Sequence, residues 1–321
     1  MTDPLTKLAI LHGTDKWGPH FYTPIYHKLF EAWRDRPITL LEIGVGGFAS
    51  PLLGGASLKM WRDYFPKAEI VGIDISEKKL DLGARITLLQ GSQTDRAFID
   101  SVVKAHGPFD IIIDDGSHFP SDVTTSFSLL FSALSDGGLY VIEDVQTAFW
   151  PEFRGSPKDG GETMSLARAI LHELNHMEIV PIAPKWTPPL RARQVKSMQA
   201  YHNILVFERG DNSAPSTRAF DGSNAHVLAA VDLMEAQLTE DPSPEGLANL
   251  SLTVAYAGDH IRAFRLAKNG LTRWPDHFWL LIAGLEAAIN VNDDIRHVYA
   301  ERLSAIAPND PSTLRLLKHV I

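Results

Sequence analysis

The fold of this chain is decided by the stretch Leu40-Leu41-Glu42-Ile43-Gly44-Val45-Gly46-Gly47, an apolar run that ends in a glycine-rich turn. Glycines in such a turn let the backbone approach a ligand closely and adopt φ values that other residues resist. The spacing differs from the G-x-G-x-x-G pattern of dinucleotide sites, and no lysine follows in the position of a phosphate-binding loop. Taken alone the turn is weak evidence, because any tight strand-to-helix connection could look the same.

Short apolar runs alternate with helical patterns around this stretch. The runs are continuously apolar, as in a parallel sheet that is covered on both faces. The predicted strands are Ile38–Ile43, Glu69–Ile75, Arg85–Gln90, Phe109–Ile113 and Leu139–Glu143, and the predicted helices are Ala56–Phe65, Arg96–Ala105 and Asp122–Leu134. Two further strands, Met177–Ile182 and Asn203–Glu208, would close the sheet as an antiparallel hairpin. The expected fold is a doubly wound, Rossmann-like α/β sheet with helices on both faces.

The composition of the chain changes after Glu208. Residues 209–222 are rich in Gly, Asp, Ser and Pro and are expected to form a linker between a domain of residues 1–208 and a helical tail of residues 223–321. Residues 1–37 would form a helical lid at the N-terminus of the domain. In the tail, Pro275 and Pro308 lie 33 residues apart, close to the period of about 34 in tetratricopeptide hairpins. A repeat-type tail is slightly favoured over a plain helical bundle, and it could contact a protein partner or a second subunit.

Charge and composition narrow the classes of function. The formal net charge of −9 argues against nucleic acid or an anionic membrane as the main partner. The absence of cysteine excludes disulfides, thiolate catalysis and zinc–sulfur sites. No secretory signal and no run of about 18 apolar residues is visible, so the expectation is a cytoplasmic protein without a membrane span.

Polar residues end the second and third predicted strands. Asp74 follows the first glycine of the turn by 30 residues, and an acid there suits the hydroxyls of a ribose. Ser92 and Gln93 lie in a polar turn that suits the edge of an adenine. The glycine-rich turn, the acid and the polar turn are each common. Found in this order on successive strand ends, they predict a site for an adenosine without a pyrophosphate, and hence for S-adenosylmethionine instead of NAD. The candidate cofactor contacts from these tips are Glu42, Gly44, Gly46, Asp74, Ser92 and Gln93.

Acidic motifs end the fourth and fifth predicted strands. Asp114 and Asp115 precede Gly-Ser-His118, and Glu143 and Asp144 follow the fifth strand. Ligands of α/β sheets bind at the carboxyl ends of the strands, so both motifs are expected beside the adenosine site. Converging carboxylates repel one another unless a cation or protons compensate. A hard divalent cation fits best, with Mg²⁺ first and Mn²⁺ as a possible substitute.

Other roles for the same residues stay open at this point. Some of the acids could cap helices or pair with Arg154 or Arg168, and Asp114 could serve the cofactor or the local turn. His118 could simply begin a helix before Asp122. Its place three residues after a candidate metal ligand favours a functional role.

Together these motifs resemble those of the metal-dependent sugar O-methyltransferases of macrolide biosynthesis, the macrocin and mycinamicin type. The likeness covers roughly the first two-thirds of the chain and is dense around both sites. The matching segments are His12–Lys16, His20–Pro24, Leu41–Gly47, Gly54–Trp61, Phe65–Pro66, Gly72–Asp74, Gly91–Asp95, Ile111–His118, Ile142–Asp144 and Tyr201–Asn203. The relatives end soon after the last strand, whereas this chain continues into the tail, and some of them carry a long N-terminal domain that this sequence lacks.

The resemblance implies a class I methyltransferase fold and a set of roles for individual residues. Asp115, Glu143 and Asp144 would hold Mg²⁺, and His118 would be the general base. Ser57, at the start of a helix, would contact the methionine part of the cofactor, where a helix N-terminus favours a carboxylate. The metal would lower the pKa of a sugar hydroxyl and orient it with its vicinal neighbour, while the histidine removes its proton during attack on the sulfonium methyl.

Three rival functions remain at this stage. A catechol or polyketide hydroxyl could replace the sugar, and Trp17, Trp150 or Trp186 could stack on either kind of acceptor. A non-catalytic scaffold would need neither the acidic cluster nor His118. Hydroxylase chemistry would normally need two histidines and a carboxylate, and in the sequence only His118 is well placed.

Overall fold

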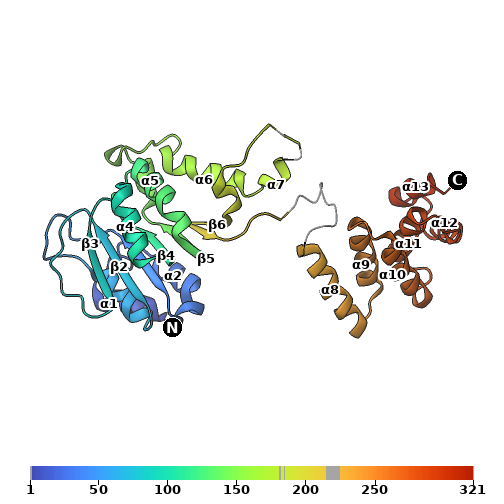
Figure 1. The fold of residues 1–321 in the computed structure, drawn as a ribbon, viewed down its shortest axis with the longest axis horizontal. Coiled ribbons are helices and arrows are strands. Elements are labelled where there is room, and N and C mark those ends of the chain that lie inside the picture. Colours follow the sequence, from blue (N-terminus) through green and yellow to red (C-terminus); the bar gives the residue numbers. More distant parts are fainter. Residues whose placement is uncertain (1, 181, 184, 215–224, 321) are drawn as a thin grey trace. The chain divides into compact units, whose positions relative to one another are not determined.

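The protein is described by a computed structural model that covers residues 2–180, 182–183, 185–214 and 225–320. The chain divides into two compact units, one of residues 1–180 with 184–213 and one of residues 214–321 with 181–183 (Figure 1). Most of the predicted linker, and residues 223 and 224 of the predicted tail, lie outside the described residues.

The larger unit is built on a seven-stranded sheet with the strand order β3-β2-β1-β4-β5-β7-β6. The first five strands along the chain are parallel, while β7 runs antiparallel to both β5 and β6. Their bounds are β1 Thr39–Ile43, β2 Glu69–Asp74, β3 Ile86–Gln90, β4 Phe109–Asp114, β5 Leu134–Ile142, β6 Val195–Tyr201 and β7 Ile204–Arg209. The predicted Rossmann-like sheet is confirmed.

The strand register brings the polar motifs to one edge of this sheet. Ile43 at the end of β1 pairs with Asp114 at the end of β4, and Asp114 pairs in turn with Ile142 at the end of β5. The residues that follow these three strands therefore leave the sheet at the same level. This register, and not any local sequence contact, makes the acids after β4 and β5 neighbours.

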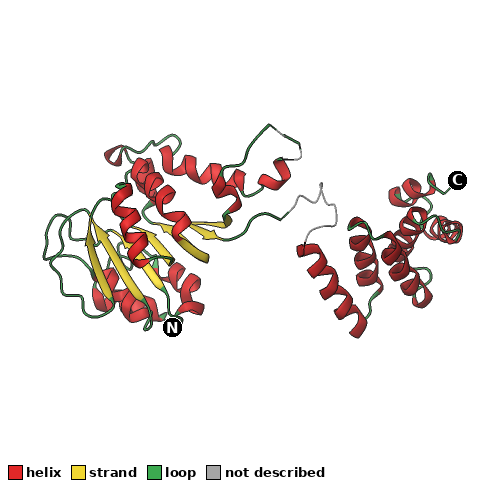
Figure 2. Ribbon diagram, viewed as in Figure 1, coloured by secondary structure: helices red, strands yellow, loops and turns green. Residues whose placement is uncertain are grey.

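Helices cover both faces of the sheet (Figure 2). On one face, α1, α2 and α3 pack against Leu40, Ile70 and Ile111 in a core that includes Trp61. On the other face, α4, α5 and α6 pack against the residues that follow these in each strand, such as Leu41. The bounds are α1 Pro4–His12, α2 Thr23–Phe30, α3 Ala56–Tyr64, α4 Arg96–His106, α5 Pro120–Leu130 and α6 Gly161–Glu173.

The predicted strand Met177–Ile182 is wrong. A short helix, α7 His176–Ile179, occupies the first half of that range, and residue 181 lies outside the described residues. The partner of β7 in the hairpin is instead β6, whose sequence Val-Lys-Ser-Met-Gln-Ala-Tyr interrupts its apolar residues with Lys196, Ser197 and Gln199. An edge strand needs no apolar run on both faces, so the sequence of β6 lacks the continuous apolar run that predicted the other strands.

The smaller unit is entirely helical in its described part. Its helices are α8 Ala225–Glu240, α9 Pro244–Tyr256, α10 His260–Arg273, α11 Phe278–Asn290, α12 Ile295–Ile306 and α13 Pro311–Leu317. The central helix α11 buries Leu280, Leu281, Leu285 and Ala288 against its neighbours. A helix that is apolar nearly all round lies inside a helical core. None of the described helices combines the length and apolar character needed to cross a bilayer.

Candidate active site

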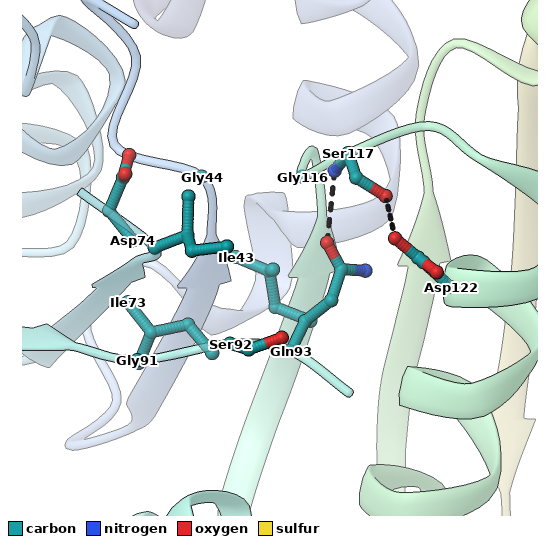
Figure 3. Close-up of a pocket in the computed structure, with 11 residues that line it drawn as sticks. Ile43, Gly44, Ile73, Asp74, Gly91, Ser92, Gln93, Gly116, Ser117 and Asp122 are labelled. Atoms are coloured by element: carbon teal, nitrogen blue, oxygen red, sulfur yellow. Dashed lines mark hydrogen bonds between the residues drawn. The ribbon is translucent and has the colours of Figure 1, made fainter. Parts of the chain in front are cut away.

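A pocket opens at the carboxyl ends of β1 to β4 (Figure 3). Four of the predicted cofactor contacts line it, namely Gly44, Asp74, Ser92 and Gln93. Gly44 has a φ of +94°, and a Cβ atom there would lie 2.0 Å from the carbonyl oxygen of Asp115. Only glycine permits this contact between the turns after β1 and β4.

Hydrogen bonds hold the polar side chains of the pocket in place. Asp74 accepts from the backbone N–H groups of Val45 (3.0 Å) and Ser76 (2.8 Å), which ties the glycine-rich turn to the end of β2. Gln93 Oε1 accepts from the Ser117 N–H at 2.9 Å, and the Ser117 hydroxyl donates to Asp122 at 2.8 Å (Figure 3). Ser117 has no role among the predictions from the sequence, although it lies inside the matching segment Ile111–His118.

Asp114 lies behind the pocket. Its carboxylate is 1% exposed and accepts from Ser126 Oγ (2.5 Å), Tyr140 OH (3.2 Å) and Gln93 Nε2 (3.2 Å). Burial raises the pKa of Asp114 to about 6, against the opposing effect of the Ser126 hydrogen bond. In this structure Asp114 therefore supports Gln93, and direct contact with the cofactor stays a prediction.

Glu42 and Ser57, two other predicted cofactor contacts, are hydrogen-bonded to each other. Ser57 Oγ donates to Glu42 Oε2 at 3.0 Å, and Glu42 is fully buried. Burial raises the pKa of Glu42 to about 7, although nearby Lys16 acts to lower it. Gly46, with a φ of +77°, also lies outside the lining of the pocket.

Next to the pocket, Asp115, His118 and Asp144 form a cluster. Each offers one ligand atom, and these atoms lie within 4.8 Å of one another. His118 Nε2 is 3.8 Å from Asp115 Oδ1 and 3.7 Å from Asp144 Oδ2. His118 and Asp144 both have positive φ values, +59° and +50°. Non-glycine residues in this region cost of order 1 kcal/mol or more and are frequent at functional sites.

The chemistry of this cluster suits a hard divalent cation. Asp144 Oδ1 accepts from Tyr22 OH (2.5 Å) and Gln146 Nε2 (3.1 Å), so Oδ2 is the oxygen that faces His118. Burial alone would raise the pKa of Asp144, but the hydrogen bonds from Tyr22 and Gln146 and the nearby histidines His118 and His20 together outweigh it, and the pKa is lowered. Asp144 is thus held ionised, which is the state that binds Mg²⁺ or Mn²⁺.

Glu143, the third predicted metal ligand, faces a lysine in this structure. Its two carboxylate oxygens lie 2.7 and 2.8 Å from Lys16 Nζ, and Tyr26 OH also donates to it. Its role as a metal ligand stays a prediction. Lys16 and Tyr22 lie within the matching segments His12–Lys16 and His20–Pro24, but nothing in their spacing shows which acids they reach, so the sequence predicts no role for either.

His20 is a further residue that the sequence analysis missed. Its Nδ1 lies 3.5 Å from Asp144 Oδ1, and its ring stacks on Tyr22 with centroids 4.7 Å apart. A second histidine therefore lies beside the acidic cluster. Of the three tryptophans considered for stacking on an acceptor, Trp186 instead packs against the ring of His172 on α6.

The sequence is similar to several curated O-methyltransferases. No protein-family model matches the sequence. The chain is 41% identical over 212 residues, 65% of its length, to the mycinamicin VI 2''-O-methyltransferase of Micromonospora griseorubida, and covers 53% of that protein. It is 42% identical over 213 residues to a rhamnosyl tetracenomycin-C 3'-O-methyltransferase of Streptomyces olivaceus (65% of this chain, 54% of that one). With the demethylmacrocin O-methyltransferase of Streptomyces fradiae the identity is 39% over 213 residues (65% and 55%).

Solved structures show the same relationship. MycE methyltransferase from the mycinamycin biosynthetic pathway, in complex with Mg and SAH, matches with a TM-score of 0.65 and 37% identity over 72% of this chain and 61% of that chain. A second MycE complex, which also contains mycinamycin VI, matches with a TM-score of 0.64 and 36% identity over 72% of this chain and 60% of that chain. The chain spans about half the length of the curated relatives it matches. The resemblance to sugar O-methyltransferases is confirmed over the matched region.

Proposed function

We propose that this chain transfers a methyl group from S-adenosylmethionine to a hydroxyl oxygen of a sugar, with the help of Mg²⁺. One observation carries the proposal. The turn after β4 supplies Gly116 and Ser117 to the pocket and Asp115 and His118 to the acidic cluster. A cofactor in the pocket and an acceptor at the cluster would therefore be neighbours, as group transfer requires.

Two groups would be bound at these places. Asp115 and Asp144 would hold the metal ion, and Glu143 is proposed as a third ligand from the resemblance to the relatives. When bound, Mg²⁺ would lower the pKa of an acceptor hydroxyl. S-adenosylmethionine would supply an electrophilic methyl group, and breaking its sulfur–methyl bond would leave S-adenosylhomocysteine (SAH).

The residues of the chain then have defined tasks. His118 accepts the proton of the acceptor hydroxyl at its imidazole, the side chain that most often serves as a general base. The carboxylates of Asp115 and Asp144, 3.8 and 3.7 Å from Nε2, stabilise the imidazolium that forms. The hydrogen bonds of Asp74, Gln93 and Ser117 keep the pocket preorganised for the nucleoside.

We propose a glycoside with vicinal hydroxyls as the acceptor. One relative is named as a 3'-O-methyltransferase of a rhamnosyl tetracenomycin, and another as a 2''-O-methyltransferase of mycinamicin VI. A catechol or polyketide hydroxyl is the alternative, because the same metal chemistry would serve it. Direct assay of transfer to rhamnosides and to catechols separates the two acceptor classes.

The layout of the chain belongs to the proposal as well. Residues 1–208 would be the methyltransferase domain, with 1–37 as a lid, and residues 223–321 a tetratricopeptide-like tail. In support of a repeat, α9 begins at Pro244 and α11 at Phe278, 34 residues later, while α10 begins at His260 and α12 at Ile295, 35 residues later. The tail would bind a protein partner or a second copy of the chain.

Isothermal titration of S-adenosylmethionine and of Mg²⁺ into EDTA-treated protein tests the proposal. Wild type is expected to bind both ligands, while Asp115→Ala loses the metal and keeps the cofactor. Asp100→Ala, which removes an exposed acid on α4, is the matched control and should bind both. Cofactor binding by a wild type that takes up neither Mg²⁺ nor Mn²⁺ would show that the metal mechanism is wrong.

A further inference from the structure

Lys16 is a buried cation at the centre of the acidic edge of the sheet. It lies in the segment between α1 and α2, and its side chain is 1% exposed. Its Nζ is 2.8 Å from Asp115 Oδ2, 2.7 Å from Glu143 Oε1 and 3.3 Å from Glu42 Oε1. The Lys16 carbonyl accepts from the backbone N–H groups of Tyr22 (3.0 Å) and Thr23 (3.3 Å), which fixes the loop that carries it.

The three acids that Lys16 contacts come from three adjacent strands. Glu42 belongs to β1, Asp115 follows β4 and Glu143 follows β5, and the order of these strands in the sheet is β1-β4-β5. Carboxylates that share one ammonium partner lie close enough to repel one another unless a cation pairs with them, and two of these three, Glu42 and Glu143, are buried. One ammonium therefore joins three strand ends that would otherwise push apart.

The contacts of this segment also determine which oxygens face the cluster. Lys16 binds Oδ2 of Asp115, and Oδ1 is the oxygen near His118. Tyr22 binds Oδ1 of Asp144, and Oδ2 is the oxygen near His118. In both acids one oxygen is held by the N-terminal segment and the other is presented to the cluster. Supporting groups of this kind orient metal ligands, and their loss typically lowers metal affinity about 10- to 100-fold.

We infer that Lys16, assisted by Tyr22, is a positioning residue that orients the carboxylates of the metal cluster. This inference rests on the proposed function, because it presupposes the metal. It also contradicts the simplest electrostatic expectation. A lysine that only repelled a metal ion would, when removed, leave the site with a higher affinity for Mg²⁺. A lysine that orients the ligands would leave it with a lower one.

The test is titration of Mg²⁺ alone into full-length, EDTA-treated wild type, Lys16→Met and Lys79→Met. Lys79 is an exposed lysine of the same unit, so its variant is the matched control. We expect Lys16→Met to bind Mg²⁺ at least about 10-fold more weakly than wild type, and Lys79→Met to match wild type. Equal or tighter binding by Lys16→Met would overturn the inference and leave the proposed function standing. Absence of Mg²⁺ binding in wild type would overturn both.

Tyr22→Phe covers the case in which Lys16→Met fails to fold. This variant removes the hydroxyl that donates to Asp144, without any change of charge. We expect it to weaken Mg²⁺ binding by about 3- to 10-fold, less than the loss of Lys16 would, because only one hydrogen bond to one ligand is lost. Its SAH affinity should stay as in wild type, because Tyr22 does not line the pocket. Unchanged Mg²⁺ affinity in Tyr22→Phe would contradict the orienting role of the segment.

Discussion

His118 is the residue on which the proposed reaction depends most directly. His118→Gln keeps a side chain of similar size but removes the group that accepts the proton. We expect kcat to fall by about 10²- to 10⁴-fold, while SAH affinity stays unchanged because His118 does not line the pocket. Transfer of a labelled methyl group to a glycoside measures the effect. His172→Gln, an exposed histidine on α6, is the control, and a fully active His118→Gln would remove His118 from the mechanism.

Individual acids show how far the sequence could predict the site. Side chains alternate between the faces of a strand, so Glu42 shares the face of Leu40, on the α3 side, and Asp114 shares the face of Ile112, on the α5 side. This alternation can be read from the sequence. It predicts that Asp114 and Asp115 point in different directions, as they do in the structure, where Asp114 lies behind the pocket and Asp115 in the cluster. The pairing of Lys16 with Glu143 was not available, because it joins residues 127 positions apart.

At the scale of elements, the cap of α1 anchors the N-terminal segment that carries Lys16. Asp3 accepts from the Thr6 N–H (2.8 Å) and the Thr6 hydroxyl (2.6 Å), and Thr6 Oγ1 in turn lies 2.6 Å from Thr23 Oγ1 of α2. Although burial opposes it, the hydrogen bonding from Thr6 lowers the pKa of Asp3. The cap therefore stabilises the fold at pH values above the ordinary pKa of an aspartate, and this contribution is lost as the pH falls through the lowered one.

Asp3→Ala should lower the free energy of unfolding by about 1 kcal/mol at pH 7. The difference from wild type should be smaller at pH 3, below the ordinary pKa of an aspartate, because protonation begins to remove the contribution of the wild-type carboxylate as the pH falls towards its lowered pKa. Denaturant unfolding of both proteins at pH 7 and pH 3 measures this difference in the free energy of unfolding. Asp3→Asn is the matched control, because asparagine caps well without a charge, and its stability should stay within a few tenths of a kcal/mol of wild type at pH 7. A difference between Asp3→Ala and wild type that is the same at both pH values would rule out the carboxylate as its source.

Strands that carry an apolar run of their own were predictable from the sequence, whereas a strand defined by its pairing with a neighbouring strand was not. The five parallel strands each carry a short apolar run, so the sequence located all five, although β5 begins at Leu134, before the predicted start at Leu139. The edge strand β6 mixes polar with apolar residues and is defined by its pairing with β7, and the start of the apolar run at Met177 became part of helix α7. Apolar character shows that a segment is buried, but a short run does not tell a strand from a helix.

At the scale of the whole molecule, the two compact units have separate hydrophobic cores. The described residues of the pocket and the acidic cluster all belong to the larger unit. The relatives match over about 210 residues, close to the length of that unit. The sequence predicted a change of architecture near residue 209 from composition alone, since a linker rich in glycine and proline needs no core.

This division predicts that residues 1–213 bind the cofactor and the metal without the tail. A chain ended after Ser213 should bind SAH and Mg²⁺ within about 2-fold of the full chain, because every contact of the site lies inside a unit with its own core. Isothermal titration of both chains measures the affinities, and circular dichroism of the shorter chain checks that it is folded. Loss of more than 10-fold in affinity for either ligand by a folded fragment would mean that the tail takes part in the site. Unchanged affinities would leave acceptor delivery or assembly as the tasks of the tail. To separate these two tasks, the rates of methyl transfer to a large glycoside and to a free sugar would then be compared between the two chains.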